Sequence, residues 1–211
     1  MTPAAELIAA ARLLDAMGFM PSKSGNLSRR LETGFLITPA GLAYAETTEA
    51  DLVALDPAGR VLAGHRRPSS EWQLHAAVYA ARPEAGAVVH THSPFATALA
   101  CARQGIPPFH YMIALGGGDD IRCSAYATFG TAALAEACVA ALAGRKAALL
   151  ANHGVVALGA SLAGARVLAI EVENLARQYL ALRSAGLAPV LLTEAELAEV
   201  HAQFGGYGRV L

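Results

Sequence analysis

The chain lacks several features that would each define a class of protein. It has only three cysteines in 211 residues, an odd number without C-x-x-C spacing, which favours reduced thiols over a disulfide framework. No apolar run approaches the roughly 20 residues of a membrane span. No basic region precedes an apolar segment at the N-terminus, so no secretory signal is expected. These absences together predict a cytoplasmic protein.

Charge of either sign is also scarce and evenly spread. Lysine and arginine number 16 and aspartate and glutamate 17, which gives a net charge of −1. The short basic patch at 65–67 is typical of a solvated loop, so neither nucleic acid nor a membrane is an expected partner. What the chain does have is 55% hydrophobic residues, largely alanine. This content predicts a single domain over residues 1–211, with a large core or buried subunit contacts.

Periodicity and turn signals predict alternating helices and strands. Helices are expected at 3–17, 69–82, 94–103, 131–142, 161–183 and 193–204. Strands are expected at 34–38, 51–56, 61–63, 87–92, 146–151 and 155–158. Residues 22–28 are expected to form a polar loop and 109–113 a short strand or extended segment. Ser69 or Ser70 is expected to cap the helix that follows. The pattern indicates an α/β fold.

The most informative motif is an apolar run, 87–92, that ends in two histidines one residue apart. Side chains alternate along a strand, so His90 and His92 would point to the same side at its end. A second apolar run, 147–151, leads to His153, and Glu71 lies near the start of a predicted helix. Three imidazoles and one carboxylate suit a divalent metal ion and leave room for a substrate.

Other interpretations of these residues must be weighed. A histidine that binds no metal is the commoner case, and a His-x-His pair alone is weak evidence. His75 is four residues after Glu71 on the same helical face, so it is a rival ligand, although we favour a core or supporting role. The polar loop 22–28 suits an anion such as phosphate, but an ordinary turn explains it more simply.

Seven segments that occur in one order resemble the class II aldolase/adducin-like family. They are 24–28, 36–39, 68–72, 89–92, 106–113, 126–131 and 152–154. Each is weak alone, but their shared order is specific, and the resemblance as a whole runs from about residue 25 to residue 208. The resemblance implies an α-β-α sandwich with a central, mainly antiparallel sheet flanked by helices. It also implies a cytoplasmic homotetramer with active sites at subunit interfaces.

The resemblance implies a metal site and a phosphate site. One zinc ion per subunit would be held by His90, His92, His153 and Glu71, although cobalt and manganese also accept nitrogen and oxygen ligands. The resemblance implies that the substrate phosphate is bound by Gly25, Asn26, Gly41, Ser69 and Ser70.

Three residues would take part in catalysis. Glu71 would leave the metal and act as the acid and base on carbon. Tyr111 would come from a neighbouring subunit and handle the proton of the aldehyde oxygen. Tyr207 would help to close the site. Two positions depart from the family pattern: Ala40 stands where a hydroxyl residue usually contacts phosphate, and Asn152 where a histidine precedes the ligand histidine.

The implied reaction is the reversible cleavage of a ketose 1-phosphate, such as L-fuculose 1-phosphate, into dihydroxyacetone phosphate and a small aldehyde. Breaking the carbon–carbon bond leaves a carbanion that is tolerable only as an enediolate, and a zinc ion stabilises this charge as a Lewis acid. A sugar-phosphate 4-epimerase, a methylthioribulose-1-phosphate dehydratase and a decarboxylase of related sugar acids are alternatives of the same fold. A non-catalytic adducin-like module is disfavoured because Glu71 and all three histidines are present.

Overall fold

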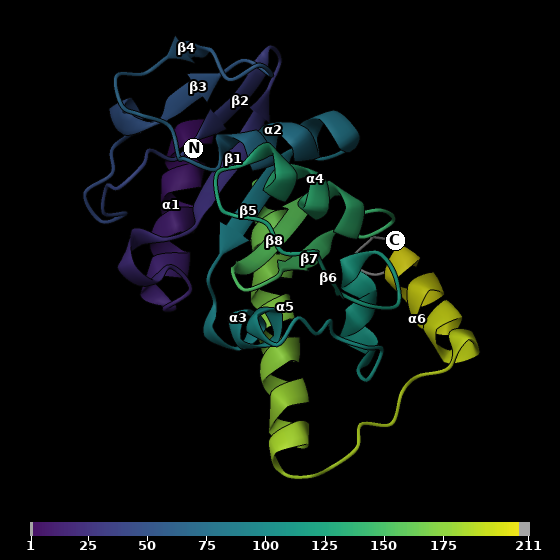
Figure 1. The fold of residues 1–211 in the computed structure, drawn as a ribbon. Helices are drawn as coiled ribbons and strands as arrows, with labels where there is room; N and C mark the ends of the chain where they lie inside the picture. The colour runs from purple at the N-terminus through teal and green to yellow at the C-terminus, as the bar shows by residue number, and fades with distance from the viewer. Residues whose placement is uncertain (1, 207–211) are drawn as a thin grey trace.

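A computed structural model describes residues 2–206 of the chain, and one open sheet runs through it (Figure 1). In the described residues the sheet has eight strands in the order β4-β3-β2-β1-β5-β8-β7-β6. The strands are β1 (Asn26–Leu31), β2 (Gly34–Ile37), β3 (Val53–Leu55), β4 (Val61–Ala63), β5 (Ala87–Thr91), β6 (Arg122–Cys123), β7 (Ala147–Leu150) and β8 (Gly154–Gly159). All neighbours pair antiparallel except β6 and β7. The prediction of a mainly antiparallel sheet is confirmed.

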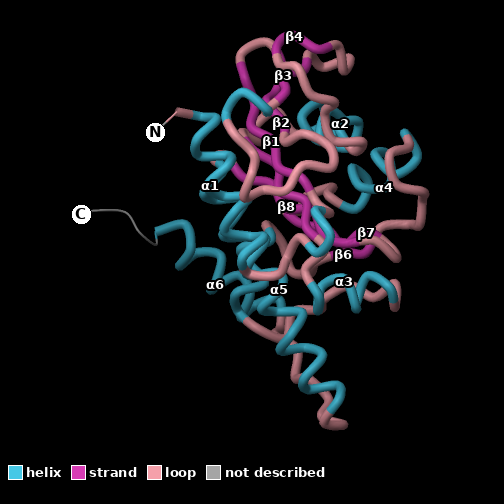
Figure 2. Tube along the Cα trace, turned by 90° about the vertical axis from the view of Figure 1, so that its left-hand side faces the viewer, coloured by secondary structure: helices cyan, strands magenta, loops and turns pink. Residues whose placement is uncertain are grey.

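Helices cover both faces of the sheet. They are α1 (Pro3–Ala16), α2 (Trp72–Ala81), α3 (Pro94–Cys101), α4 (Ala132–Ala141), α5 (Leu162–Ser184) and α6 (Glu194–Gly206). One core lies between the sheet and α1, α3 and α5, and a second lies between the sheet and α2 and α4. Figure 2 shows α1 on one side of the strands and α2 and α4 on the other.

Strand β5 shows how the sequence produces these layers. Its side chains alternate, so Ala87 and Val89 pack into the first core and Val88 into the second. A strand buried on both faces needs apolar residues at every position, which explains the uninterrupted run that precedes His90. The expected α-β-α sandwich is therefore confirmed. Among the helices of residues 2–206, none combines the length and hydropathy needed to cross a bilayer.

The strand β1 was not predicted, because residues 26–28 were assigned to a polar loop. Its sequence is polar, yet it pairs with β2 on one side and β5 on the other. The guanidinium of Arg30 donates to the carbonyl oxygens of three residues outside the strand, which satisfies this partly buried charge. Tertiary pairing thus overrides a composition that alone favours a loop.

Two other local predictions are wrong. Helix α2 begins at Trp72 without a side-chain cap: the Ser69 hydroxyl accepts a hydrogen bond from the backbone N–H of Glu71, the residue before the helix, and not from an N–H within it. Residues 109–113 do not form a strand: Tyr111–Gly116 is a 3-10 helix. This helix begins where Nδ1 of His110 accepts a hydrogen bond from the backbone N–H of Met112.

Candidate metal centre

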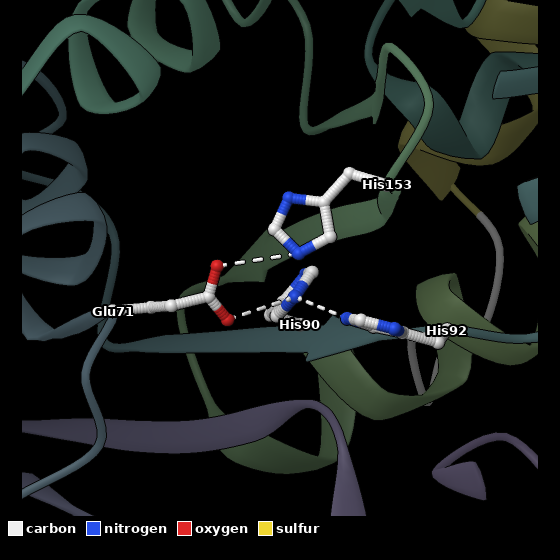
Figure 3. Close-up of side chains that lie close together, drawn as sticks. All are labelled: Glu71, His90, His92 and His153. Carbon is white, nitrogen blue, oxygen red and sulfur yellow. Dashed lines mark hydrogen bonds and ion pairs between the residues drawn. The ribbon is translucent and has the colours of Figure 1, made fainter. Parts of the chain in front are cut away.

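Four side chains from three separate segments converge at one end of β5 (Figure 3). His90 and His92 come from the end of β5, His153 from the β7–β8 turn, and Glu71 from the residue before α2. One ligand atom from each lies within 4.8 Å of the others. The three imidazole centroids are each 4.9 Å apart. The structure thus brings together the four residues that the sequence suggests as metal ligands.

The β7–β8 turn has the backbone geometry that this convergence requires. Its three residues, 151–153, include Asn152 in the left-handed region at φ 56°, which asparagine adopts more readily than most residues. Gly154 follows, and a Cβ there would lie 2.5 Å from the carbonyl oxygen of Thr91. Only glycine therefore lets the turn approach β5 closely enough to direct His153 into the cluster.

Glu71 is buried, yet its charge is favoured. Its Oε2 accepts a hydrogen bond from Nδ2 of Asn26 at 2.9 Å and lies 3.1 Å from Nε2 of His90. Its Oε1 lies 3.3 Å from Nε2 of His153 and accepts no hydrogen bond. Burial alone would raise the pKa of the Glu71 carboxyl, but the charge of His90 and the hydrogen bonds from His90 and Asn26 outweigh it and hold that pKa well below its usual range.

The histidines are arranged to direct lone pairs at one point. Nδ1 of His90 lies 3.0 Å from the carbonyl oxygen of Val155, so it donates there and leaves Nε2 facing the cluster. Burial, together with the charge of His90, lowers the pKa of His92 to about 3 and that of His153 to about 4. These two imidazoles are therefore neutral near pH 7, which is the form that binds metals.

Without a metal ion the cluster must share a proton. Burial lowers the pKa of His90, but the Glu71 carboxylate raises it more, so the net direction is upward. Nε2 of His90 lies 3.0 Å from Nε2 of His92, and two lone pairs cannot face each other so closely. A divalent cation would satisfy both nitrogens and the unbonded Oε1 of Glu71. The donor set therefore fits a metal ion.

A cavity of about 340 Å³ opens beside the cluster. It is lined by Lys23, Ser24, Gly25, Asn26, Pro39, Ala40, Gly41, Ser69, Ser70, Glu71, His92, Tyr126, Ala127, Phe129, Asn152 and His153. All five residues suggested for phosphate binding are among them. Gly25 has φ 86°, and a Cβ there would lie 2.7 Å from the carbonyl oxygen of His90, so this approach also depends on glycine.

Sequence reasoning missed three side chains of this cavity. Lys23 brings a positive charge from the polar loop, and Tyr126 and Phe129 add two aromatic side chains to the lining. Tyr126 and Phe129 are 56% and 65% exposed. The available signal was their place in matched segments or beside one, which does not show that they face a common cavity.

Of the two tyrosines suggested for catalysis, Tyr111 is not at the cluster in this single chain. Tyr111 is 53% exposed and does not line the cavity. Its ring stacks on His110, with a centroid distance of 4.9 Å, and on Phe204, at 6.3 Å. Tyr207 lies outside the described residues. His75, the rival ligand, is not part of the cluster and lies fully buried behind Asn26.

The site thus consists of three histidines and a glutamate beside a cavity at one end of an open mixed sheet. The family described as the Class II Aldolase and Adducin N-terminal domain matches residues 5–180. The chain belongs to this family, and it is a class II aldolase by similarity over nearly its whole length.

Similarity to individual proteins is also extensive. The chain is 50% identical over 203 residues to the 5-methylthioribulose-1-phosphate/5-deoxyribulose-1-phosphate aldolase of Rhodospirillum rubrum, covering 96% of this chain and 90% of that protein. It is 44% identical over 192 residues to an L-fuculose phosphate aldolase of Escherichia coli, covering 91% and 89%. A solved structure of L-fuculose 1-phosphate aldolase matches with a TM-score of 0.92 and 38% identity, covering 96% and 95%.

Proposed function

We propose that this chain is a zinc-dependent aldolase that reversibly cleaves a ketose 1-phosphate into dihydroxyacetone phosphate and a small aldehyde. The observation that carries the proposal is the convergence of Glu71, His90, His92 and His153 beside a cavity of polar groups. Zinc suits a set dominated by imidazole nitrogen with one oxygen ligand. We further propose that the enzyme is a cytoplasmic homotetramer.

Each residue has a defined task in this proposal. The zinc ion supplies Lewis-acid stabilisation of the negative charge that develops as the carbon–carbon bond breaks. In cleavage, Glu71 delivers a proton to the carbon that keeps the electron pair, and in condensation it removes that proton. Tyr111, supplied by a neighbouring copy of the chain, takes the proton of the hydroxyl that becomes the aldehyde oxygen. Tyr207 helps to close the site.

Phosphate binding would hold the substrate in position. Gly25, Asn26, Gly41, Ser69 and Ser70 line the cavity and bring backbone groups and two hydroxyls to it. Ser69 and Ser70 precede α2, separated from it by Glu71, and the N-terminus of this helix favours an anion. These groups bind the phosphate away from the reacting carbon, so the proton-transfer residues need not bind it. The bound phosphate holds the sugar in a fixed position relative to Glu71.

We infer that the sugar ends in an apolar carbon. The relatives are named for 5-methylthioribulose 1-phosphate, 5-deoxyribulose 1-phosphate and L-fuculose phosphate. The last carbon of each of these sugars bears a methylthio group or is a methyl group without oxygen. Removing dihydroxyacetone phosphate from these sugars leaves methylthioacetaldehyde, acetaldehyde or lactaldehyde. The rings of Tyr126 and Phe129 offer an apolar surface to such an end. The relative at 50% identity acts, by its name, on the two ribulose phosphates. They are therefore candidates to test beside L-fuculose 1-phosphate.

The test is aldol condensation. Zinc-loaded protein is incubated with dihydroxyacetone phosphate and each of these three aldehydes, with and without a chelator, and products are identified by mass. Chelator-sensitive carbon–carbon bond formation supports the proposal, and the fastest aldehyde indicates the sugar. In a separate incubation with the sugar phosphates themselves, loss of water from methylthioribulose 1-phosphate would favour the dehydratase, and inversion at one carbon of a sugar phosphate would favour the epimerase. Protein that binds no metal and forms no product would support the non-catalytic module.

A further inference from the structure

A chain of hydrogen bonds leads from Glu71 into the core between β1 and α2. Oε2 of Glu71 accepts from Nδ2 of Asn26, whose Oδ1 lies 2.5 Å from Nε2 of His75. Nδ1 of His75 lies 2.6 Å from Oγ of Ser28, which lies 2.7 Å from the hydroxyl of Tyr79. All five residues are at most 6% exposed.

This chain of hydrogen bonds forms where one face of strand β1 packs against one face of helix α2. Asn26 and Ser28 are two residues apart on β1, so they share one face of the sheet. Glu71, His75 and Tyr79 are four residues apart at the start of α2 and along it, so they share one face of the helix. Polar groups buried at this depth are destabilising unless they are hydrogen-bonded, and each has a partner here.

The donor and the acceptor of each hydrogen bond follow from the charge of the Glu71 carboxylate. An ionised carboxylate only accepts, so Asn26 must present its Nδ2 to Glu71 and its Oδ1 to His75. Nε2 of His75 must then carry the hydrogen. Nδ1 is left as an acceptor for the hydroxyl of Ser28, which in turn accepts from Tyr79. A flipped Asn26 amide would instead set Oδ1 2.9 Å from the carboxylate oxygen.

We propose that His75 is a positioning residue that acts on Glu71 through Asn26. By fixing the amide of Asn26, His75 keeps Oε2 of Glu71 hydrogen-bonded and leaves Oε1, which accepts no hydrogen bond, as the oxygen directed at the metal ion and the substrate. Without the Nε2–H of His75, the amide can rotate and the carboxylate is no longer held in one orientation. The kinetic part of this inference rests on the proposed aldolase function.

Two matched substitutions test the role of the Nε2–H group. His75→Gln places an amide N–H near the position of Nε2, whereas His75→Asn reaches only the position of Nδ1. We expect His75→Asn to lower kcat about 10- to 100-fold with KM and zinc content nearly unchanged, because proton transfer depends on orientation. We expect His75→Gln to recover kcat to within about 5-fold of the unsubstituted enzyme. Equal losses in both variants, or no loss in His75→Asn, would overturn the proposal.

The tautomer of His75 provides a test that needs neither aldolase activity nor a folded variant. The imidazole ¹⁵N shifts of the unsubstituted protein distinguish a hydrogen on Nε2 from one on Nδ1, and we expect a neutral ring with the hydrogen on Nε2. A hydrogen on Nδ1, or a charged ring at pH 7, would overturn the proposal even if the enzyme is an aldolase. An Nε2–H ring in a protein without aldolase activity would uphold the hydrogen-bond chain and refute the proposed reaction instead.

Discussion

At the scale of single residues, Glu71 combines burial with charge. A carboxylate removed from water is destabilised unless neighbouring groups compensate, and here His90 and Asn26 do so. The same contacts leave one oxygen without a hydrogen bond. That arrangement suits a group which first binds a cation and then exchanges a proton with the substrate.

We predict that Glu71→Gln abolishes turnover and spares the fold. An amide cannot act as the acid and base, so kcat should fall at least about 100-fold. The three imidazoles remain, so most of the zinc should stay bound. Steady-state kinetics and elemental analysis measure the two effects, with Glu136→Gln on the exposed side of α4 as the control. Turnover near that of the control would exclude Glu71 from proton transfer.

At the scale of elements, a carboxylate from α5 holds the start of α3. Glu173 is 6% exposed, and its two oxygens accept hydrogen bonds from the backbone N–H groups of Phe95 and Ala96 at 2.9 and 2.8 Å. An anion at a helix N-terminus is favourable because the free N–H groups carry partial positive charge. Helix α3 begins two residues after His92, so this contact also holds the end of the metal-binding segment.

We predict that Glu173→Gln lowers the free energy of unfolding by about 1–3 kcal/mol. Glutamine loses the charge, and its NH₂ group must face a backbone N–H that was previously satisfied. Denaturant titration measures the change. Glu171→Gln on the same helix should have little effect, because its oxygen can still accept from Asn174. Equal stability of the two variants would show that Glu173 does not hold α3.

Elements that depend on local signals were predictable from the sequence, and those that depend on distant contacts were not. Helix α6 was predicted near its observed position, and a local signal marks its start: Thr193 and Glu196 exchange capping hydrogen bonds there. Strand β1 was missed because its polar residues find partners far along the chain, such as Asn26 with Glu71, 45 residues away.

The same distinction applies to the candidate site. Strand alternation placed His90 and His92 on one side, and the apolar run 147–151 located His153. The sequence could not show that Lys23, Tyr126 and Phe129 line the same cavity, because that depends on how loops from different strands meet.

At the scale of the whole molecule, the metal ligands connect distant segments of chain, from Glu71 to His153. The unfolded chain does not hold these groups together, so a metal ion should bind the native state and stabilise it. We predict that zinc at about 100 times its dissociation constant raises Tm by about 5–10 °C. His92→Ala should bind little zinc and show a small shift, whereas His65→Ala, on an exposed loop, should behave as the unsubstituted protein. An equal shift in His92→Ala would place the zinc elsewhere.

The proposed homotetramer predicts that active sites are shared between copies of the chain. If Tyr111 comes from a neighbouring copy, a Glu71→Gln chain and a Tyr111→Phe chain each lack one group, but their mixture can form complete sites. Random mixing in equal amounts should restore about a quarter of the sites, because each needs two intact groups from different chains. The rate after co-refolding, compared with each variant alone, measures this. No recovery, in mixtures shown to contain both chains in one oligomer, would place Tyr111 in the site of its own chain.

The most direct test of the metal-dependent aldolase is a zinc titration of chelated protein. The rate of dihydroxyacetone phosphate release from a ketose 1-phosphate is followed as zinc is added. We predict no cleavage without metal, a rate that rises in proportion to zinc, and a break at one zinc ion per chain, as one cluster of Glu71 and three histidines requires. Cleavage that proceeds without metal, or that survives unchanged in His92→Ala, would contradict the account.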